Sequence, residues 1–401
     1  MPIAVKPKLS FFLKIDDYLQ VDLVAPILST FKLVESTTLF VPTAKIVFTD
    51  DTGLLIDNYD RLYTGELKYN IGFPDEFGTE NMNEYTHYLF TQQPSELFTS
   101  MTTNSVVFSF VTWDKIGPKL MMQDYVKSFD GEKSASEVVQ ELISDMGLEE
   151  GVIEPSKDKQ HYIQAQWTNA QFIRYLAEHA EAESGTRGFL YFVDRDGKFS
   201  FCSPEYLYKE NKGSAVKLTF TNNPAYYEDH KLETVLSWRF VSRAQLWLTN
   251  MSYGKIFKYF DHEDYKYDEE TKTLKDDVSN FNTTEYALLN EDFTDYTKST
   301  TVNTKNVDKF KLSTRSTGSL IDLLVLIKYN EDIKLGSVVK FYHPIQDLKE
   351  REQKLTLDMI GSDWIVSHVT HMVDKNSMTY YMRIVLTRCG IAQKEASKLM
   401  Q

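Results

Sequence analysis

Apolar and polar residues alternate along much of the first 127 positions in the way that half-buried strands require. One such run spans 11–15 and another spans 44–48, while 106–111 is more continuously apolar. Short runs of this kind, separated by turns, are typical of a barrel or a sandwich. Residues 74–100 are polar and predict a loop within that arrangement.

Two amphipathic helices follow, and each carries the signature of a capping box. Ser134 and Glu137 have the required spacing in the first helix, and Thr168 and Gln171 have it in the second. In a capping box, the side chain of each residue accepts a hydrogen bond from the backbone N–H of the other. The apolar stripe at 138–146 gives the first helix one buried face.

A small α+β domain is predicted over residues 128–205, which contain both helices. Trp167 precedes the cap of the second helix and is spaced to pack on Phe172 as a hydrophobic staple. A β-hairpin over 189–202 follows, with the Asp-Gly pair at 196–197 as a two-residue turn.

Strand patterns resume after this domain and continue, with one interruption, to a terminal hairpin at 364–388. The interruption at 255–315 is polar and acidic, and predicts long loops with a short helix near 284–290. The run at 320–329 is apolar enough for burial on both faces. It is either a central strand of one domain or a strand that another subunit covers, and the pattern leaves both open.

Composition places the protein among globular chains and argues against a nucleic-acid clamp. The 401 residues are 42% hydrophobic and 13% aromatic, which suits several domains rich in strands. The formal charge of −14 disfavours a surface that binds a phosphate backbone. Cys202 and Cys389 lie outside any CxxC pattern, so we expect a reducing compartment and no disulfide framework. No window has the apolar length of a signal peptide or a membrane-spanning helix.

Candidate metal sites in the sequence fail on geometry. His368 and His371 lie three positions apart in a predicted strand, so their side chains point to opposite faces and do not share an ion. A second set lacks the spacing of a helical zinc site and is interpreted as the solvated face of the second helix. This set comprises Glu178, His179, Glu181 and Glu183. A third, acidic set lacks the ligand pattern of a calcium loop and is interpreted as a solvated loop. That set comprises Asp261, His262, Glu263, Asp264, Asp268, Glu269 and Glu270.

Catalytic motifs are equally scarce. Residues 185–188 follow a helix and form too short a glycine-containing loop to hold a phosphate. Cys202 has no histidine near it in sequence, and no GxSxG motif occurs. We therefore predict a protein that is not an enzyme, with no catalytic, cofactor-binding or metal-binding residues. A carbohydrate hydrolase whose two acids are brought together only by the fold is the enzymatic alternative.

Four local sequences occur in order along the chain: residues 131–147, 166–201, 334–341 and the terminal hairpin at 362–390. Together they resemble those of the central hub proteins of contractile-tailed bacteriophages. Hubs of this family end in a strand with a spaced aromatic–Val–Val–His pattern, a polar turn, and a strand rich in Tyr and Leu. The positions that fill this pattern here are Trp364, Val366, Val369, His371, Tyr381 and Leu386.

The resemblance implies a mainly β (α+β) fold built from two tube-like β-barrel domains. The first barrel would span 8–127, and the second would join 206–250 to 316–391. The α+β domain at 128–205 would be inserted between them. Residues 251–315 would form a polar, loop-rich insertion, for which the family offers no counterpart, and 392–401 would form a C-terminal tail.

The resemblance also implies a function in assembly. Such hubs are homotrimers, so three chains present six similar barrels that adapt a six-fold tail tube to a three-fold central spike. The implied partners are the tail-tube protein, the spike protein and other baseplate proteins, while DNA passes through the channel without specific binding. The implied location is the tail baseplate of the virion, after synthesis in the host cytoplasm. The alternative within this class is the hub of a related injection system, such as a tailocin or a type VI secretion spike.

Overall fold

The computed structural model describes most of the chain outside its ends and several connecting segments. The described residues are 8–14, 20–23, 28–37, 39–50, 53–74, 80–100, 103–183, 189–219, 233–242, 255–261, 266–272, 285–288, 321–330, 332–342, 363–374 and 379–387.

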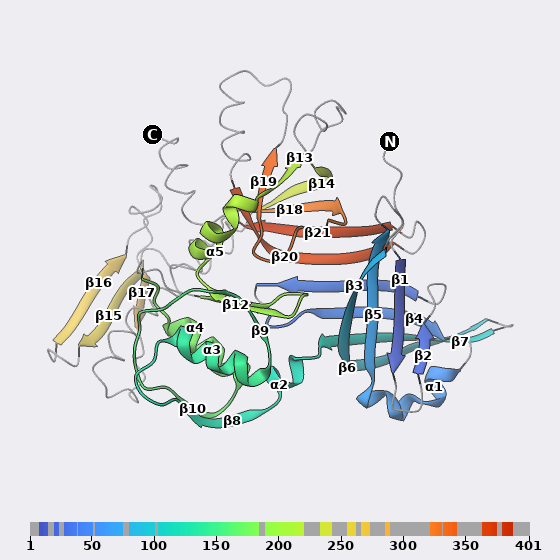
Figure 1. Ribbon diagram of the computed structural model, residues 1–401, viewed down its shortest axis with the longest axis horizontal. Helices are drawn as coiled ribbons and strands as arrows, with labels where there is room; N and C mark the ends of the chain where they lie inside the picture. The colour runs from blue at the N-terminus through green and yellow to red at the C-terminus, as the bar shows by residue number, and fades with distance from the viewer. Residues whose placement is uncertain are drawn as a thin grey trace, which may run out of the picture.

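The first strand region is built from strands that occur consecutively in the sequence (Figure 1). They are β1 (Lys8–Lys14), β2 (Gln20–Leu23), β3 (Leu28–Ser36), β4 (Thr43–Asp50), β5 (Glu66–Pro74), β6 (Glu80–Ser100) and β7 (Thr103–Asp114). Three short helices accompany them: α1 (Leu54–Asp57), the 3-10 helix η2 (Tyr59–Thr64) and α2 (Gly117–Met121). The strands pair in the order β3-β4-β7-β6-β5-β1-β2, which among the described residues is an open series.

Alternation along these strands decides which side chains enter the core. In β4, Ile46 and Phe48 are buried, whereas Lys45 is exposed, as the sequence pattern predicts. The predicted polar loop over 74–100 is wrong, because β6 occupies 80–100 and pairs with β5 on one edge and β7 on the other. Main-chain hydrogen bonds on both edges fix this strand whatever the polarity of its side chains.

The second strand region combines segments that lie far apart in the sequence. They are β13 (Val216–Thr219), β14 (Glu233–Ser242), β18 (Ile321–Lys328), β19 (Val338–Tyr342), β20 (Asp363–Asp374) and β21 (Thr379–Thr387). They pair in the order β19-β13-β14-β18-β21-β20, and a further pairing between β19 and β20 returns this series to its start. These six strands therefore form a hydrogen-bonded cycle. The predicted terminal hairpin is confirmed as β20 and β21.

Both strand regions belong to one 13-stranded sheet, because β20 pairs with β3. A single hydrophobic core spans the two regions, from Leu13 and Phe48 in the first to Val325 and Leu386 in the second. The predicted mainly β fold class is confirmed. The partition into two barrels with the predicted bounds stays a prediction.

A compact unit of helices and short strands packs beside this sheet with a core of its own (Figure 1). It contains β8 (Asp124–Ser128), α3 (Ala135–Met146), β9 (Glu149–Ile153), β10 (Ile163–Thr168), α4 (Asn169–His179), β11 (Leu190–Val193) and β12 (Lys198–Cys202). The helix α5 (Pro204–Asn211) and the 3-10 helix η3 (Lys212–Ser214) lead from it into β13. A further three-stranded sheet consists of β15 (Lys255–Asp261), β16 (Lys266–Lys272) and β17 (Glu285–Leu288).

The predicted starts of both long helices are confirmed. Ser134 and Glu137 form a complete capping box on α3, and Thr168 and Gln171 form one on α4. The Trp167 ring lies 6.1 Å from the Phe172 ring, as a staple requires, although 37% of its surface is still exposed.

Two local predictions need correction. The hairpin of β11 and β12 turns through three residues, 195–197, because Asp194 N–H donates to Lys198 O and Gly197 takes a left-handed φ of 80°. This conformation suits a three-residue hairpin loop better than a two-residue turn. The helix predicted near 284–290 is wrong, since Glu285–Leu288 forms β17 and pairs in parallel with β15. That pairing is a non-local contact, which local sequence periodicity does not report.

Candidate functional site at the seam between the strand regions

The seam is the line along which the N-terminal and C-terminal parts of the chain meet. The β3–β4 hairpin and the β20–β21 hairpin join edge to edge through antiparallel pairing of β3 with β20 (Figure 1). Leu33 lies opposite His371, and Glu35 lies opposite Val369. Beyond the strand end, Thr37 N–H donates to Ser367 O at 3.0 Å and extends the contact. One strand from each region therefore forms the pair that joins the two regions.

A buried acid and a buried histidine meet at this seam. Glu35 and His371 are each 1% exposed, and Glu35 Oε1 lies 2.6 Å from His371 Nε2. The other carboxyl oxygen, Oε2, accepts from the backbone N–H of Arg195 at 3.2 Å. Arg195 is itself 6% exposed, and its guanidinium lies 5.8 Å from the centre of the Tyr329 ring. Glu35 thus binds both the second strand region and the β11–β12 turn.

Burial determines the protonation state of His371. Removal from water lowers the pKa of His371, and the nearby Arg195 lowers it further, while Glu35 opposes both effects. The imidazole is therefore neutral near pH 7 and donates from Nε2 to the Glu35 carboxyl group. Its Nδ1 atom has no hydrogen-bond partner among the described residues. A neutral ring in this position costs less than a buried cation would.

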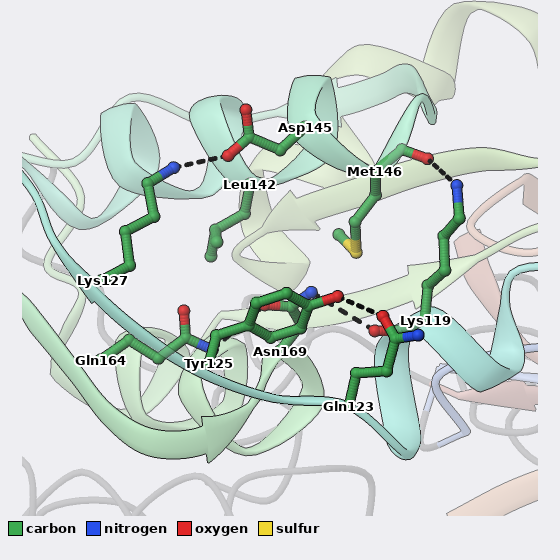
Figure 2. A pocket seen from close by; sticks show the side chains of 9 residues that line it. All are labelled: Lys119, Gln123, Tyr125, Lys127, Leu142, Asp145, Met146, Gln164 and Asn169. Carbon is green, nitrogen blue, oxygen red and sulfur yellow. Dashed lines mark hydrogen bonds and ion pairs between the residues drawn. The ribbon is translucent and has the colours of Figure 1, made fainter.

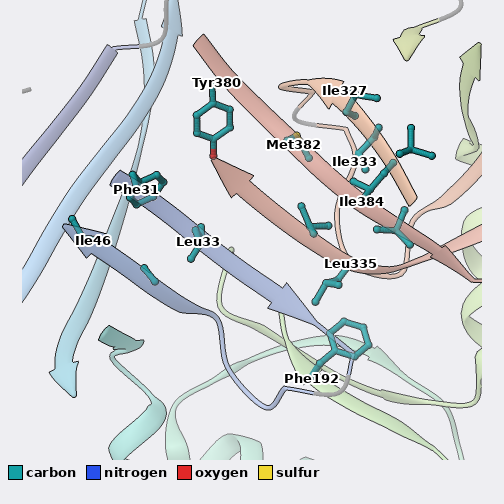
Figure 3. Packing of buried hydrophobic residues seen from close by; sticks show 14 of the residues in the cluster. Phe31, Leu33, Ile46, Phe192, Ile327, Ile333, Leu335, Tyr380, Met382 and Ile384 are labelled. Carbon is teal, nitrogen blue, oxygen red and sulfur yellow. The ribbon is translucent and has the colours of Figure 1, made fainter. Parts of the chain in front are cut away.

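Apolar side chains from both regions surround the polar contact. Figure 3 shows this packing, with side chains from β3, β4 and β21 directed into one core. Its labelled members include Phe31, Leu33, Ile46, Tyr380, Met382 and Ile384. Phe192 of β11 reaches the same core, so the α+β unit also contributes to it. The interior of the seam is therefore packed with buried apolar side chains.

The β11–β12 turn ties the α+β unit to the seam. Asp194 Oδ1 accepts from the backbone N–H groups of Asp196 and Lys198, each at 2.9 Å. Burial raises the pKa of Asp194 to about 6, and the negative charges of Asp196 and Glu35 add to this effect. Lys334 Nζ forms an ion pair with Asp196 at 2.5 Å, across a sequence separation of 138. The turn therefore contacts the first region through Glu35 and the second through Lys334.

The metal pairs considered in the sequence are not brought together. His371 faces Glu35 in the core, whereas His368 is half-buried and lies opposite Ser36. On α4, His179 Nδ1 lies 2.7 Å from Tyr175 O, and Glu178 pairs with Arg174. The separate neighbours of the two strand histidines agree with the sequence interpretation. The interpretation of the second set as a solvated helix face is wrong in part, because Glu178 and His179 are half-buried and α4 ends at His179, before Glu181 and Glu183. Within the described ranges, no group of three or more His, Cys, Asp or Glu side chains is placed to hold a metal.

The remaining candidates are Cys202, the acidic set and the loop at 185–188. Cys202 is buried, and burial raises the pKa of its thiol well above the usual range, so the reactive thiolate is disfavoured. Asp261 ends β15 opposite Lys266. Residues 185–188, together with 262–265 of the acidic set, lie outside the described residues. No helix within the described segments is long and apolar enough to cross a membrane.

Sequence reasoning missed Glu35 and Arg195. Glu35 follows Phe31 and Leu33 at the same alternation, which places it on the buried face of its strand. A charged residue at a buried position of a strand pattern is the one signal that points to a buried partner. Arg195 gives no such signal, because it lies in a turn whose neighbours are mostly polar.

Comparison with solved structures identifies the fold. No family model matches the sequence, and no curated protein matches it. The structure is similar to the 43 kDa tail protein of prophage MuSo2 from Shewanella oneidensis, with a TM-score of 0.57 at 12% identity. That alignment covers 96% of this chain and 99% of that chain. This chain has the fold of a phage tail protein.

Two further structures share this fold. A tail protein from Neisseria meningitidis aligns with a TM-score of 0.55 at 10% identity, over 96% of this chain and 98% of that chain. A chain of the half-lidded PdpA-VgrG complex of Francisella aligns with a TM-score of 0.50 at 10% identity. It covers 95% of this chain but 58% of that longer chain. The resemblance to tail hubs drawn from the sequence is thus confirmed at the level of the fold.

Proposed function

We propose that this protein is the structural hub of a contractile phage-tail baseplate, assembled as a homotrimer between the tail tube and the central spike. The observation that carries the proposal is the seam, in which β3 and β20 hold two strand regions in one sheet with one core. A chain with two strand regions presents six of them in a trimer, as an adapter between six-fold and three-fold partners requires. Whole-length likeness to two tail proteins supports it.

The unlike parts of the chain supply the three-fold side. The α+β unit and the β15–β17 sheet occur once per chain and lie to one side of the 13-stranded sheet (Figure 1). One copy per chain gives three copies per trimer, so the end that carries them has three-fold symmetry alone. The opposite end would offer the tube protein six similar edges.

The outer face of β18 is our proposed contact between subunits. Leu323, Val325 and Ile327 fill the core, whereas Leu324 and Leu326 on the other face are half-buried. On the neighbouring strand, Val385 pairs with Leu324 and is also half-buried. Apolar side chains left partly exposed on a central strand favour burial against another subunit.

The net charge of the chain supports a channel through which DNA passes. A net charge of −14 repels a DNA backbone, so DNA would slide through the assembly without binding. The buried thiol and the buried imidazole are held neutral inside packed cores, where they serve structure. The likeness to a chain of the Francisella PdpA-VgrG complex supports one second candidate, the hub of a related injection system.

Co-sedimentation tests the proposal. The full chain is mixed separately with the tail-tube protein and with the spike protein of its own genome, and each mixture is centrifuged. Binding to both partners is the expected result. A Leu326→Glu variant should lose trimerisation in analytical ultracentrifugation while its β-rich circular dichroism spectrum is retained, because Leu326 does not belong to the core. Leu54→Glu, the same substitution at an exposed position in α1, is the matched control. Failure of the wild-type chain to bind either partner would refute the hub.

A further inference from the structure

The α+β unit contains a cleft lined by both apolar and charged side chains. It lies between α3 and the ribbon formed by β8 and β10, and encloses about 150 Å³ (Figure 2). Leu142 and Met146 of α3 line one wall, and Tyr125 lines the other. A volume of this size holds one ring-sized group. The function proposed above makes no use of it.

A buried oxygen in this cleft has no donor. Gln164 is 0% exposed, and its Oε1 atom has no hydrogen-bond partner among the described residues. Figure 2 shows this oxygen directed into the space below Leu142. A buried carbonyl without a donor costs about 1–3 kcal/mol, so an occupant that supplies one is favoured.

The orientation of the Gln164 amide is fixed by its neighbours. Its Nε2 group donates to Trp167 O at 2.9 Å and to Asn169 Oδ1 at 3.1 Å. Asn169 is oriented in turn, because its Nδ2 group donates to Lys119 O at 3.4 Å. A flipped Gln164 amide would set its oxygen against two acceptors. The atom that faces the cleft is therefore an acceptor, and the ligand must be a donor.

The charged groups at the rim of the cleft further restrict the class of ligand that can bind. Lys127 Nζ pairs with Asp145 at 2.5 Å, and Lys119 Nζ donates to Met146 O at 3.5 Å. Two ammonium groups beside one carboxylate disfavour a cation. An anion would place its oxygens against Gln164 Oε1, which repels them. A neutral group with an N–H or O–H donor satisfies both conditions.

The side chains that line the cleft favour a ligand whose donor group is attached to an aromatic ring. Met146 offers a thioether, which contacts aromatic rings favourably. Lys119 also lines the cleft, and an ammonium group attracts the face of an aromatic ring. We propose that this cleft binds a phenol group, with its ring between Leu142, Met146 and Tyr125 and its hydroxyl donating to Gln164 Oε1. The group comes either from a small phenolic solute or from a tyrosine side chain.

Methyl NMR on the full chain tests the site. The protein is labelled with ¹³C-methyl methionine, and the Met146 signal among its 12 methionines is assigned with Met146→Leu. We expect p-cresol to shift the Met146 signal to saturation at millimolar concentration. 4-Methylanisole has the same ring without a donor, and should bind about fivefold more weakly because it leaves Gln164 Oε1 unsatisfied. This comparison needs no variant.

A variant then tests whether Gln164 is the residue that discriminates between the two ligands. Gln164→Met keeps the chain length and removes the oxygen, so the two ligands should bind it equally, provided that its methyl spectrum remains that of the folded protein. An acetylated Gly-Tyr-Gly amide distinguishes the sources. If the peptide shifts the Met146 signal to saturation, the natural ligand is a tyrosine side chain of a polypeptide. If only p-cresol does so, the natural ligand is a small phenol. Equal binding of p-cresol and 4-methylanisole to the wild type, or an unmoved Met146 signal, overturns the proposal and leaves a water-filled cleft.

Discussion

Glu35 and His371 are separated by 336 positions in the sequence, yet Glu35 Oε1 lies 2.6 Å from His371 Nε2 in the packed interior of the seam. The contact ties the third strand of the chain to the hairpin that ends the described part. Both groups lie where their exposure to water is about nil, so each needs the other to satisfy its hydrogen bonds. The pair therefore links the two strand regions through buried side chains, in addition to the main-chain pairing of β3 with β20.

Removal of the Glu35 side chain should destabilise the protein strongly. Glu35→Ala leaves the Arg195 backbone N–H and His371 Nε2 buried without an acceptor, and we expect a loss of about 3–5 kcal/mol in the free energy of unfolding. Urea denaturation at pH 7 measures the loss. Glu35→Gln keeps one acceptor oxygen and should cost less than half as much. Equal losses for the two variants would show that the acceptor contacts contribute nothing.

Acid should destabilise the first strand region through His87. Burial lowers the pKa of His87 to about 3, below the ordinary value of 6.5 that holds when the chain is unfolded. The unfolded chain therefore binds a proton between pH 6.5 and 3 that the native state does not, so stability falls as the pH falls through this window. His87→Gln retains a donor for Thr112 Oγ1 and removes the titration.

We expect the wild type to lose about 3 kcal/mol more than His87→Gln between pH 7 and pH 4. Urea midpoints of both proteins across this range provide the measurement. Parallel pH profiles would mean that His87 is protonated in the native state at pH 4.

The titration of Asp194 should change stability with pH in the opposite direction. Its pKa of about 6 lies above the ordinary carboxyl value of 3.8, so the native state binds a proton more tightly than the unfolded chain does. Stability attributable to Asp194 therefore falls as the pH rises from 4 to 6. Asp194→Asn keeps Oδ1 for the turn and removes the charge, and should raise stability at pH 7 by about 3 kcal/mol. A variant less stable than the wild type at pH 7, yet equal at pH 4, would contradict this.

Substitutions at two glycines distinguish the cost of backbone strain from the cost of side-chain crowding. Gly336 and Gly197 both have left-handed φ values, of 77° and 80°. A Cβ atom on Gly336 would lie 3.0 Å from the Leu207 side chain, whereas one on Gly197 would meet nothing within 4 Å. We expect Gly197→Ala to cost about 1 kcal/mol from backbone strain and Gly336→Ala to cost about 1 kcal/mol more. Thermal melts of both variants compare them, and a larger effect at Gly197 would contradict the crowding argument.

The sequence predicted the parts of this fold that depend on neighbours along the chain. The capping boxes at Ser134 and Thr168 involve residues three positions apart, so their spacing is visible without any structure. The terminal hairpin is equally local. Strand β6 was missed because its partners, β5 and β7, supply the main-chain hydrogen bonds that define it, while polar residues dominate its N-terminal part, 80–84.

The candidate site was invisible for a related reason. Glu35, Arg195 and His371 come from three separate segments, and only folding brings them together. Gln164 gave no signal either, since a glutamine in a strand is ordinary until its oxygen proves to be buried without a donor. Residue type and spacing reveal local geometry, whereas burial and long-range pairing require the structure.

The most direct test of the proposed function is a count of chains at the end of a tail tube. Electron cryomicroscopy of the full chain bound to its tail-tube protein, reconstructed without imposed symmetry, provides it. We predict three chains in a ring, with two strand regions per chain joined by the β3–β20 seam, and six such regions facing six tube subunits. Six chains in the ring, or a ring in which only one strand region of each chain faces the tube, would contradict the hub.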